Sequence, residues 1–508
     1  MEAVLDAVHQ RGVVFGNLHG GNILLDEHDA VGLIDFELAC PVEQATRPAL
    51  GVPGFRAPAG RVGFDLDRYA LAAVRLWAFL PLNPLLELEP GKLPGYLDFV
   101  ARRFDLPAGY PDRISRELAP RDDIPAARTE LDQRTPDWSA VRKSIAEAIL
   151  AGATPHRGDR LFPGDIEQFA SGGVAFGHGA AGVLYALDAG GVGRYPEHEQ
   201  WLSDAVRRHP PQHPGFSRGA HGIAYVLDRF GQHDLATELL TRCAPMVSGI
   251  GDHSLSGGLA GIGLTLLHLA EARQDNDFLT EAAAIGQRLA AALPRAKPPG
   301  SDGKAGLMHG WSGPGLLFIR LSDHTGDRRW LDLADRAVAR DLLECVETPH
   351  RSLQVSDGRR TLPYLEIGSA GIAVVLTELA CRAPGSPTVA SLGDLLESCV
   401  GEFVVHSGLQ LGRAGQVVAL AHANRWLADP RLDQAIERHL VRLRWHAIPY
   451  GGGLAFPGNQ LLRLSMDLDT GSAGVLLALA AVLDQHGPVL PFLTEQAPSA
   501  GAATAPAR

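Results

Sequence analysis

The chain has 508 residues, of which 45% are hydrophobic and 20% are charged. At about 150 residues per domain this length predicts two to four domains, and the apolar content excludes a mainly disordered chain. The formal net charge of −12, from 46 basic and 58 acidic residues, argues against nucleic-acid binding as the main role.

The cysteines and the N-terminal segment bear on the expected compartment. The five cysteines are scattered without a CxxC motif, so neither a disulfide framework nor a zinc knuckle is predicted. No basic and apolar leader follows Met1, and no run of about 18 apolar residues predicts a membrane span. We therefore expect a cytoplasmic protein with neither a nucleic acid nor a membrane as its partner.

The chain separates into zones by composition. Residues 1–105 mix short β-like runs with helical runs, and residues 106–164 are rich in Pro, Asp and Arg, which is typical of a linker with one or two helices. Residues 165–495 carry an unusual number of glycines. Residues 496–508 are small and polar, and we expect a disordered tail there.

The glycines of the third zone belong to an internal repeat. A G-x-x-G element followed by an apolar run occurs seven times, at successive spacings of 40, 39, 52, 58, 44 and 59 residues. The first glycines of the seven elements are Gly179, Gly219, Gly258, Gly310, Gly368, Gly412 and Gly471. Between them lie amphipathic stretches such as residues 281–293.

This alternation predicts one helical hairpin per repeat. An apolar run without a polar face is typical of a helix buried all round, and an amphipathic run is typical of a helix with one exposed face. Seven such hairpins can close on themselves as a mainly α-helical α/α toroid, with the buried helices inside. An open solenoid is the rival, but it favours a more regular period than the one observed.

Residues 13–37 carry the first chemical motif, VVFGNLHGGNILLDEHDAVGLIDFE. The segment resembles the catalytic loop and metal-binding hairpin of protein kinases, with Asn17, Asn22 and Asp35 at the motif positions. Asn22 and Asp35 carry the oxygen ligands that Mg²⁺ prefers. Residues 64–77 resemble the buried helix of the kinase C-lobe, with Asp67 as its inward acid.

Two features depart from the kinase pattern. Asn17 is the residue at the place of the catalytic aspartate, and a neutral amide cannot accept the substrate proton. The Gly-rich strands and lysine of a kinase N-lobe do not precede the motif. We expect no phosphorylation by this polypeptide alone, and binding of a Mg-nucleotide (ATP or GTP) only when an N-lobe completes the site.

A kinase-like C-lobe followed by seven GxxG hairpins resembles the C-terminal two-thirds of a class III lanthipeptide synthetase. The local sequences LMHGWSGPGLLFIRL (307–321) and LAFPGNQLLRLSMDLDTGSAGVLLAL (454–479) agree with that resemblance. It implies a cytoplasmic enzyme that modifies a precursor peptide carrying a leader. In that family, a lyase and a complete kinase dehydrate Ser or Thr, and a cyclase-like domain adds a Cys thiol to the product.

Related lanthionine cyclases of other classes hold zinc through two Cys and one His. The corresponding places in this chain are Glu366, Gln410 and Leu411. Without a thiol or imidazole at these places a tetrahedral zinc site is not expected. The resemblance therefore implies a zinc-free cyclase.

A zinc-free cyclase needs another means of activating the thiol. His309, just before the fourth GxxG, is the candidate general base, because an imidazole can take the thiol proton and return it. His178 and His221 occupy related positions in the first two repeats, and a helix cap or a buried hydrogen bond is the alternative role for them. Candidate substrate-binding residues near the GxxG turns are His178, His221, Tyr364, Arg413 and Asp467.

Three functions remain open from the sequence. The first is a cyclase that adds thiols to dehydroamino acids. The second is a non-catalytic peptide-docking scaffold, or the remnant of a split synthetase whose lyase and kinase N-lobe come from a separate polypeptide. The third is a toroidal glycosidase, for which the turns offer only Glu366 and the pair Asp467 and Asp469.

Overall fold

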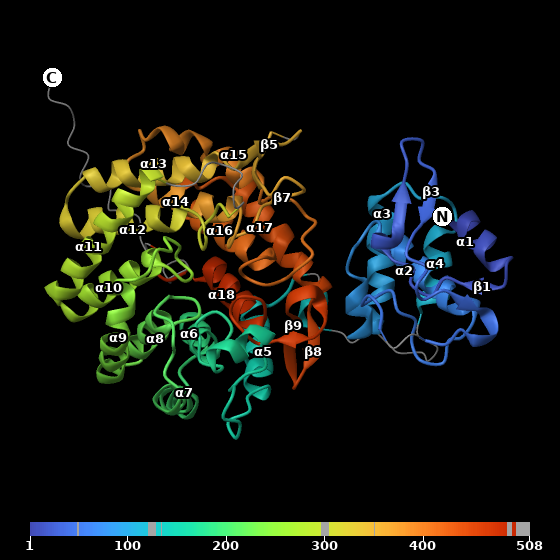
Figure 1. The fold of residues 1–508 in the computed structure, drawn as a ribbon, viewed down its shortest axis with the longest axis horizontal. Helices are drawn as coiled ribbons and strands as arrows, with labels where there is room; N and C mark the ends of the chain where they lie inside the picture. Colours follow the sequence, from blue (N-terminus) through green and yellow to red (C-terminus); the bar gives the residue numbers. More distant parts are fainter. Residues whose placement is uncertain are drawn as a thin grey trace. The chain divides into compact units, whose positions relative to one another are not determined.

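The computed structural model describes residues 1–47, 50–119, 129–133, 135–295, 304–349, 351–484 and 490–493. The chain divides into two compact units, Met1–Arg128 with Gln460–Arg463 and Thr129–Asn459 with Leu464–Arg508. Figure 1 draws the N-terminal unit in blue and the second unit from green to red. Within the described residues, every helix is too short or too polar to span a membrane.

In its described residues, the first unit combines four α-helices with two small pairs of antiparallel strands. Strand β1 pairs with β4, and β2 forms a hairpin with β3. The elements are α1 (Glu2–His9), β1 (Val13–Val14), β2 (Ile23–Leu25), β3 (Val31–Leu33), β4 (Cys40–Pro41), α2 (Phe64–Trp77), α3 (Leu93–Arg103) and α4 (Tyr110–Leu118). A small core forms where Leu5 of α1 and Leu71 of α2 pack on Phe15 and Leu18.

The second unit consists of two concentric sets of helices (Figure 1). The inner helices are α6 (Ala180–Ala189), α8 (Ala220–Arg229), α10 (Leu259–Arg273), α12 (Ser312–Thr325), α14 (Ser369–Arg382), α16 (Arg413–Leu427) and α18 (Ser472–Leu483). The outer helices are α5 (Trp138–Ala151), α7 (Pro196–Arg208), α9 (His233–Val247), α11 (Asn276–Ala292), α13 (Arg329–Leu342), α15 (Leu392–Glu397) and α17 (Pro430–Arg442). Each inner helix packs against the next, and α18 packs against α6, so the inner set is closed.

Two small sheets account for the longest repeat spacings. The connection before α14 contains the antiparallel sheet β5 (Cys345–Glu347), β6 (Leu353–Ser356) and β7 (Thr361–Leu362). The connection before α18 contains β8 (Ile448–Tyr450), β9 (Gly453–Pro457) and β10 (Leu464–Ser465). The irregular spacing therefore comes from connections of different length, whereas the helical hairpin recurs in every repeat.

A ring of backbone hydrogen bonds closes the toroid at the N-termini of the inner helices. Each bond joins residues that lie two positions before the first glycine of successive repeats, with N···O distances of 2.8–3.1 Å. The donors and acceptors are Gly177 to Ser217, Ser217 to Ser256, Ser256 to Met308, Met308 to Glu366, Glu366 to Gln410, Gln410 to Asp469, and Asp469 back to Gly177. The prediction of a closed toroid rather than an open solenoid is confirmed.

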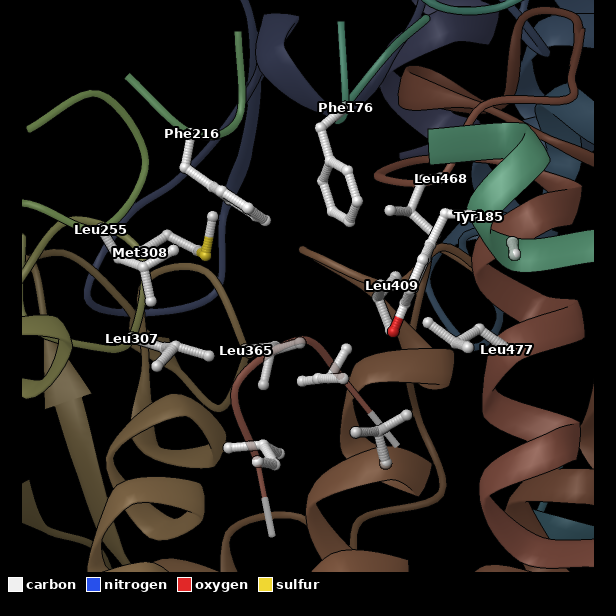
Figure 2. Packing of buried hydrophobic residues seen from close by; sticks show 14 of the residues in the cluster. Phe176, Tyr185, Phe216, Leu255, Leu307, Met308, Leu365, Leu409, Leu468 and Leu477 are labelled. Atoms are coloured by element: carbon white, nitrogen blue, oxygen red, sulfur yellow. The ribbon is translucent and has the colours of Figure 1, made fainter. Parts of the chain in front are cut away.

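The residue before each ring residue points into the helical barrel and forms an apolar layer (Figure 2). All seven side chains are buried: Phe176, Phe216, Leu255, Leu307, Leu365, Leu409 and Leu468. Burial of a side chain of this size is worth about 1.5–3 kcal/mol. The layer lies directly beneath the hydrogen-bonded ring and supports it.

The second glycine of each GxxG allows this layer to form. A Cβ atom on Gly371 would lie 2.3 Å from the carbonyl oxygen of Leu365 and 2.9 Å from Cβ of Leu307 in the preceding repeat. In all seven repeats the Cβ would approach the corresponding carbonyl oxygen to less than 3.0 Å. Only glycine permits this approach, which explains the motif.

The segment 490–493 packs into the barrel on the other side of the apolar layer. Phe492 makes edge-on contacts with Phe216 at 4.9 Å and Tyr225 at 5.3 Å between ring centroids. Its carbonyl oxygen accepts a 2.7 Å hydrogen bond from Nε of Arg320. The interior of the toroid is thus a packed core.

The segment 106–164 differs from the predicted linker. Helix α4 packs on α2 and α3 of the first unit and buries Ile114 and Leu118. Helix α5 packs on α18 and β9 and belongs to the outer ring of the second unit. Although the segment is polar in composition, α4 and α5 each have one buried apolar face. The tail predicted at 496–508 lies outside the described residues.

We predict that Gly371→Ala lowers the free energy of unfolding by about 1–3 kcal/mol, because the new methyl group overlaps backbone that cannot move independently. Gly393→Ala is the matched control, since no atom lies within 4 Å of its Cβ position in α15. Urea unfolding followed by circular dichroism measures both. Equal midpoints for the two variants would contradict the close-packing account of the motif.

Candidate functional site

A cavity of about 390 Å³ lies above the hydrogen-bonded ring, at the N-termini of the inner helices. Because every repeat reaches this point in the same register, residues one or two positions before the first glycine of each repeat line it. Among the polar side chains that line it are His178, His309, Glu366, Gln410 and Asp469. These residues come from five repeats, the first and the fourth to seventh.

His309 forms the first of two histidine–carboxylate pairs in the cavity. Its Nε2 lies 2.8 Å from Oε1 of Glu366, and both side chains remain about one quarter exposed. A carboxylate bound to one ring nitrogen orients an imidazole and fixes which of the two ring nitrogens faces the reactants. In this pair, the other ring nitrogen of His309, Nδ1, can therefore accept and donate a proton.

His178 forms the second pair, with two aspartates. Its Nδ1 lies 3.7 Å from Oδ2 of Asp467, and its Nε2 lies 3.7 Å from Oδ2 of Asp469. Burial opposes a charge on the ring, but the carboxylates outweigh it and raise the pKa of His178 to about 9. His178 is thus a cation at neutral pH.

The side chain of Asp469 contacts both His178 and Gln410 in the cavity. Burial raises the pKa of Asp469 to about 6, against the opposing effect of the His178 charge. Its Oδ1 accepts a hydrogen bond of 3.3 Å from Nε2 of Gln410. Its carbonyl group belongs to the backbone ring, so its side chain is held at a fixed place.

Asp341 fixes the loop that carries His309. Its carboxylate accepts hydrogen bonds from the backbone N–H groups of Gly306, Trp311 and Ser312, and from the Ser312 hydroxyl, at 2.7–3.1 Å. Burial raises the pKa of Asp341 to about 6, and the four donors oppose that rise. An outer helix thereby determines the position of a side chain in the central cavity.

Two of the predicted substrate-binding residues, His221 and Arg413, have partners inside the protein. The His221 ring is buried and binds the carbonyl oxygen of Pro214, and burial lowers its pKa to about 4. Arg413 is fully buried and donates to His439 at 3.0 Å and to the Glu402 carbonyl at 3.1 Å. Neither residue is among the described residues that line the cavity.

Asp467 and Tyr364 also lie outside the cavity lining among the described residues. Asp467 is buried and accepts hydrogen bonds from the N–H groups of Asp165 at 2.6 Å and Thr470 at 2.7 Å. Its place beneath His178 gives it an indirect influence on the cavity through the pKa of that ring. Tyr364 is partly buried, and burial raises the pKa of its hydroxyl.

The first unit brings its three predicted residues together. Nδ2 of Asn22 lies 3.0 Å from the Asn17 carbonyl oxygen, and the side-chain amides of both asparagines lie 3.5 Å from Oδ2 of Asp35. Asp35 has a φ of 65°, in the left-handed region that non-glycine residues seldom adopt. Such strained backbone is common at binding and catalytic sites.

Asp67 is the buried anchor of this cluster. Its carboxylate accepts hydrogen bonds from the N–H groups of Phe15 at 2.7 Å and Gly16 at 2.8 Å, and His9 lies 2.8 Å away. The loop that carries Asn17 is therefore tied to helix α2. The hairpin β2–β3 then places Asn22 opposite Asp35.

Sequence reasoning found His309 and His178 but did not assign Asp469 or Gln410 to this cavity, and it did not single out Asp341. The position two residues before each first glycine was the available signal for Asp469 and Gln410. No comparable signal exists for Asp341, because it lies on an outer helix 29 residues after Ser312.

Comparison with known proteins adds a relative in sequence. No family model matches the chain. The chain is 38% identical over 554 aligned residues to a probable SapB synthase of Streptomyces coelicolor. The alignment covers 100% of this chain and 59% of the relative. The chain is thus similar in sequence to a class III lanthipeptide synthetase. It spans 59% of the length of that synthetase.

Solved structures offer more distant likenesses. Nisin cyclase is 14% identical with a TM-score of 0.47, over 64% of this chain and 91% of that chain. A family 76 glycoside hydrolase from Bacteroides thetaiotaomicron is 14% identical with a TM-score of 0.37, over 71% of this chain and 79% of the other.

The pKa of His178 predicts a pH-dependent stability. A folded-state pKa of about 9 against an ordinary value of 6.5 means that His178 stabilises the fold fully below pH 6.5. This contribution, on the order of 3 kcal/mol, is lost as the pH rises from 6.5 through about 9.

We therefore expect His178→Gln to unfold with a free energy that is less dependent on pH across this window than that of the unmodified protein. In the unmodified protein Asp469 has a pKa of about 6, and loss of the His178 charge in this variant raises the pKa of Asp469 further, so the profile is compared over the whole range from pH 6 to 9. His156→Gln, at an exposed position, is the control. Chemical unfolding at several pH values measures the difference, and parallel pH profiles for both variants would refute the assignment.

Proposed function

We propose that the toroidal unit is a lanthionine-forming cyclase that acts without zinc on a dehydrated precursor peptide. The observation that carries the proposal is the central cavity, which holds two histidine–carboxylate pairs at the point where all seven repeats meet. The relationship to a SapB synthase supports a peptide as substrate. None of the five cysteines lines this cavity, so the reacting thiol belongs to the substrate.

In the proposed first step, His309 acts as the general base. With Nε2–H donated to the Glu366 carboxylate, Nδ1 carries the lone pair and takes the proton of the Cys thiol. The sulfur forms a bond to the β-carbon of the dehydroamino acid. The electron pair of the carbon–carbon double bond moves toward the adjacent carbonyl group and gives an enolate.

The second step returns the proton. The His178 cation lies in the same cavity and stabilises the negative charge of the enolate oxygen. The His309 imidazolium then donates its proton to the α-carbon, which completes the thioether and restores the base. The sequence is an addition without oxidation or reduction, so no further reactant is needed.

Zinc does not fit the residues at the corresponding places. The Glu366 carboxylate is bound to His309, the Gln410 amide is bound to Asp469, and Leu411 carries no donor atom. The proposed reaction therefore depends on the imidazoles of this chain.

For the first unit we propose a kinase-like role that requires a kinase N-lobe. Asn22 and Asp35 would hold Mg²⁺, which would bring the phosphates of ATP or GTP to the site. Asn17 lies at the place of the base and cannot accept a proton, so phosphorylation requires a residue from elsewhere. A kinase N-lobe and a lyase domain would complete this site.

Incubation with a dehydrated Cys-containing precursor peptide tests the cyclase proposal. We expect enzyme-dependent loss of alkylatable Cys by mass spectrometry, reduced at least about 100-fold in rate by His309→Ala, since general-base catalysis is worth about 10²–10⁴. Glu366→Gln is expected to show a smaller loss, because Gln keeps the shape but not the charge. His209→Ala, at an exposed position, is the control.

Each other outcome has a distinct meaning. If thiol loss survives His309→Ala, the cyclase proposal stands without His309 as the base. If no enzyme-dependent loss occurs, the protein is a peptide-docking scaffold or requires its missing partner, and the cyclase proposal for the single chain is wrong.

Nucleotide binding by the first unit has a separate test. We expect Mg-ATP or Mg-GTP to raise the thermal unfolding midpoint of the full chain, in the presence of the polypeptide that supplies the N-lobe, and Asp35→Asn to remove that rise. Asp105→Asn, at an exposed site, is the control. An unchanged rise in Asp35→Asn would contradict the assigned metal ligand.

A further inference from the structure

A second and larger cavity opens beside the central one in the toroidal unit. Its volume is about 630 Å³, and it lies between the C-terminal ends of α11 and α13. His309 lines both cavities, so the proposed general base stands at their junction. A chain that occupied this cleft would pass directly to the reacting groups.

The cleft carries a concentration of positive charge. Arg288, Arg295 and Lys304 are exposed at its rim, and Arg340 lies half-buried in its wall. Arg288 donates to the carbonyl oxygens of Val247, Ser248 and Ile250, which hold it in place without neutralising it. The whole chain has a net charge of −12, so this patch contrasts with the average surface.

The acidic groups of the cleft are engaged by neighbours. Asp341 is buried and accepts four hydrogen bonds from the loop 306–312. Asp252 accepts hydrogen bonds from N and Oγ of Ser254 at 2.8 and 2.9 Å. Glu344 lies 3.7 Å from Arg340. Among the described lining residues, the exposed rim therefore carries three cations, Arg288, Arg295 and Lys304, and one exposed carboxylate, Asp252.

A flat aromatic wall completes the cleft. The rings of His253 and Trp311 stack with centroids 4.4 Å apart and an interplanar angle of 10°. Both residues line the cleft, and Trp311 directly follows the turn that bears His309. Because Trp311 is buried at 8% exposure, the partly exposed His253 ring is the surface that this pair offers to a peptide next to the cationic rim.

We propose that this cleft binds an acidic stretch of the precursor peptide and thereby delivers the neighbouring Cys and dehydroamino acid to His309. The proposal rests on the proposed cyclase function, and it specifies that the peptide segment bound in the cleft is negatively charged. Cations at the rim attract Asp and Glu side chains, and the aromatic wall accepts the intervening residues. Recognition by charge also implies binding that weakens with salt.

The binding test uses unreactive peptides, so it does not depend on ring formation. Two fluorescent peptides of equal length, without Cys or dehydroamino acids, differ only in carrying Asp and Glu or Lys at the same positions. Fluorescence anisotropy with the full chain is expected to show tighter binding of the acidic peptide, and weaker binding as salt is added.

The double variant Arg295→Glu with Lys304→Glu is expected to weaken binding of the acidic peptide by about 10-fold, equivalent to about 1.4 kcal/mol. The matched control is Arg242→Glu with Arg336→Glu, which makes the same change of net charge at exposed positions outside the cleft lining. Circular dichroism and the unfolding midpoint confirm that both variants are folded.

Several outcomes would overturn the proposal. Equal affinity for the two peptides would show that the cleft does not recognise charge. If the control pair weakened binding as much as the cleft pair, the effect would come from the overall charge of the protein and not from the cleft. Competition by inorganic phosphate at the same concentration as the acidic peptide would indicate a site for a small anion. A reactive acidic peptide that cyclises with unchanged KM in the cleft variant would show that binding there does not serve the reaction.

Discussion

The closed ring of seven backbone hydrogen bonds is the constraint on which the toroidal unit depends. Each repeat donates one N–H to the next repeat and accepts one from the previous repeat, so no repeat is terminal. The buried backbone groups at the helix entrances are thus paired within the ring. The GxxG glycines and the apolar layer beneath follow from the same requirement, because both bring successive chain segments within hydrogen-bonding distance.

In the hydrogen-bonded ring, the backbone maintains the fold and the side chains determine the chemistry of the cavity. Backbone atoms close it, so the side chains at the same positions are free to vary, and they range from Gly177 to Met308 and Asp469. Variation at one register position therefore creates the cavity chemistry without changing the fold. The two histidines stand one position later, at the first and fourth repeats, and each meets a carboxylate that a different repeat supplies.

Much of this architecture could be predicted from the sequence, because a seven-fold motif with apolar runs has few other interpretations. The adjacency of Asn22 and Asp35 followed from a short hairpin. The pairing of His309 with Glu366, 57 residues apart, could not be predicted, because it depends on the order of repeats around the ring. The burial of His221 and Arg413 could not be predicted either, since no sequence pattern links them to their partners, the carbonyl groups of Pro214 and Glu402 and the ring of His439.

The contact between α6 and α18 sets a condition on how the toroid folds. The first inner helix meets its second neighbour only after the last repeat has been synthesised. Until then, an apolar flank of α6 lacks its cover, and the ring lacks two of its bonds. Closure joins segments that are far apart in the chain, which makes it a slow step of high contact order. A nascent toroid is therefore most exposed to aggregation just before it closes.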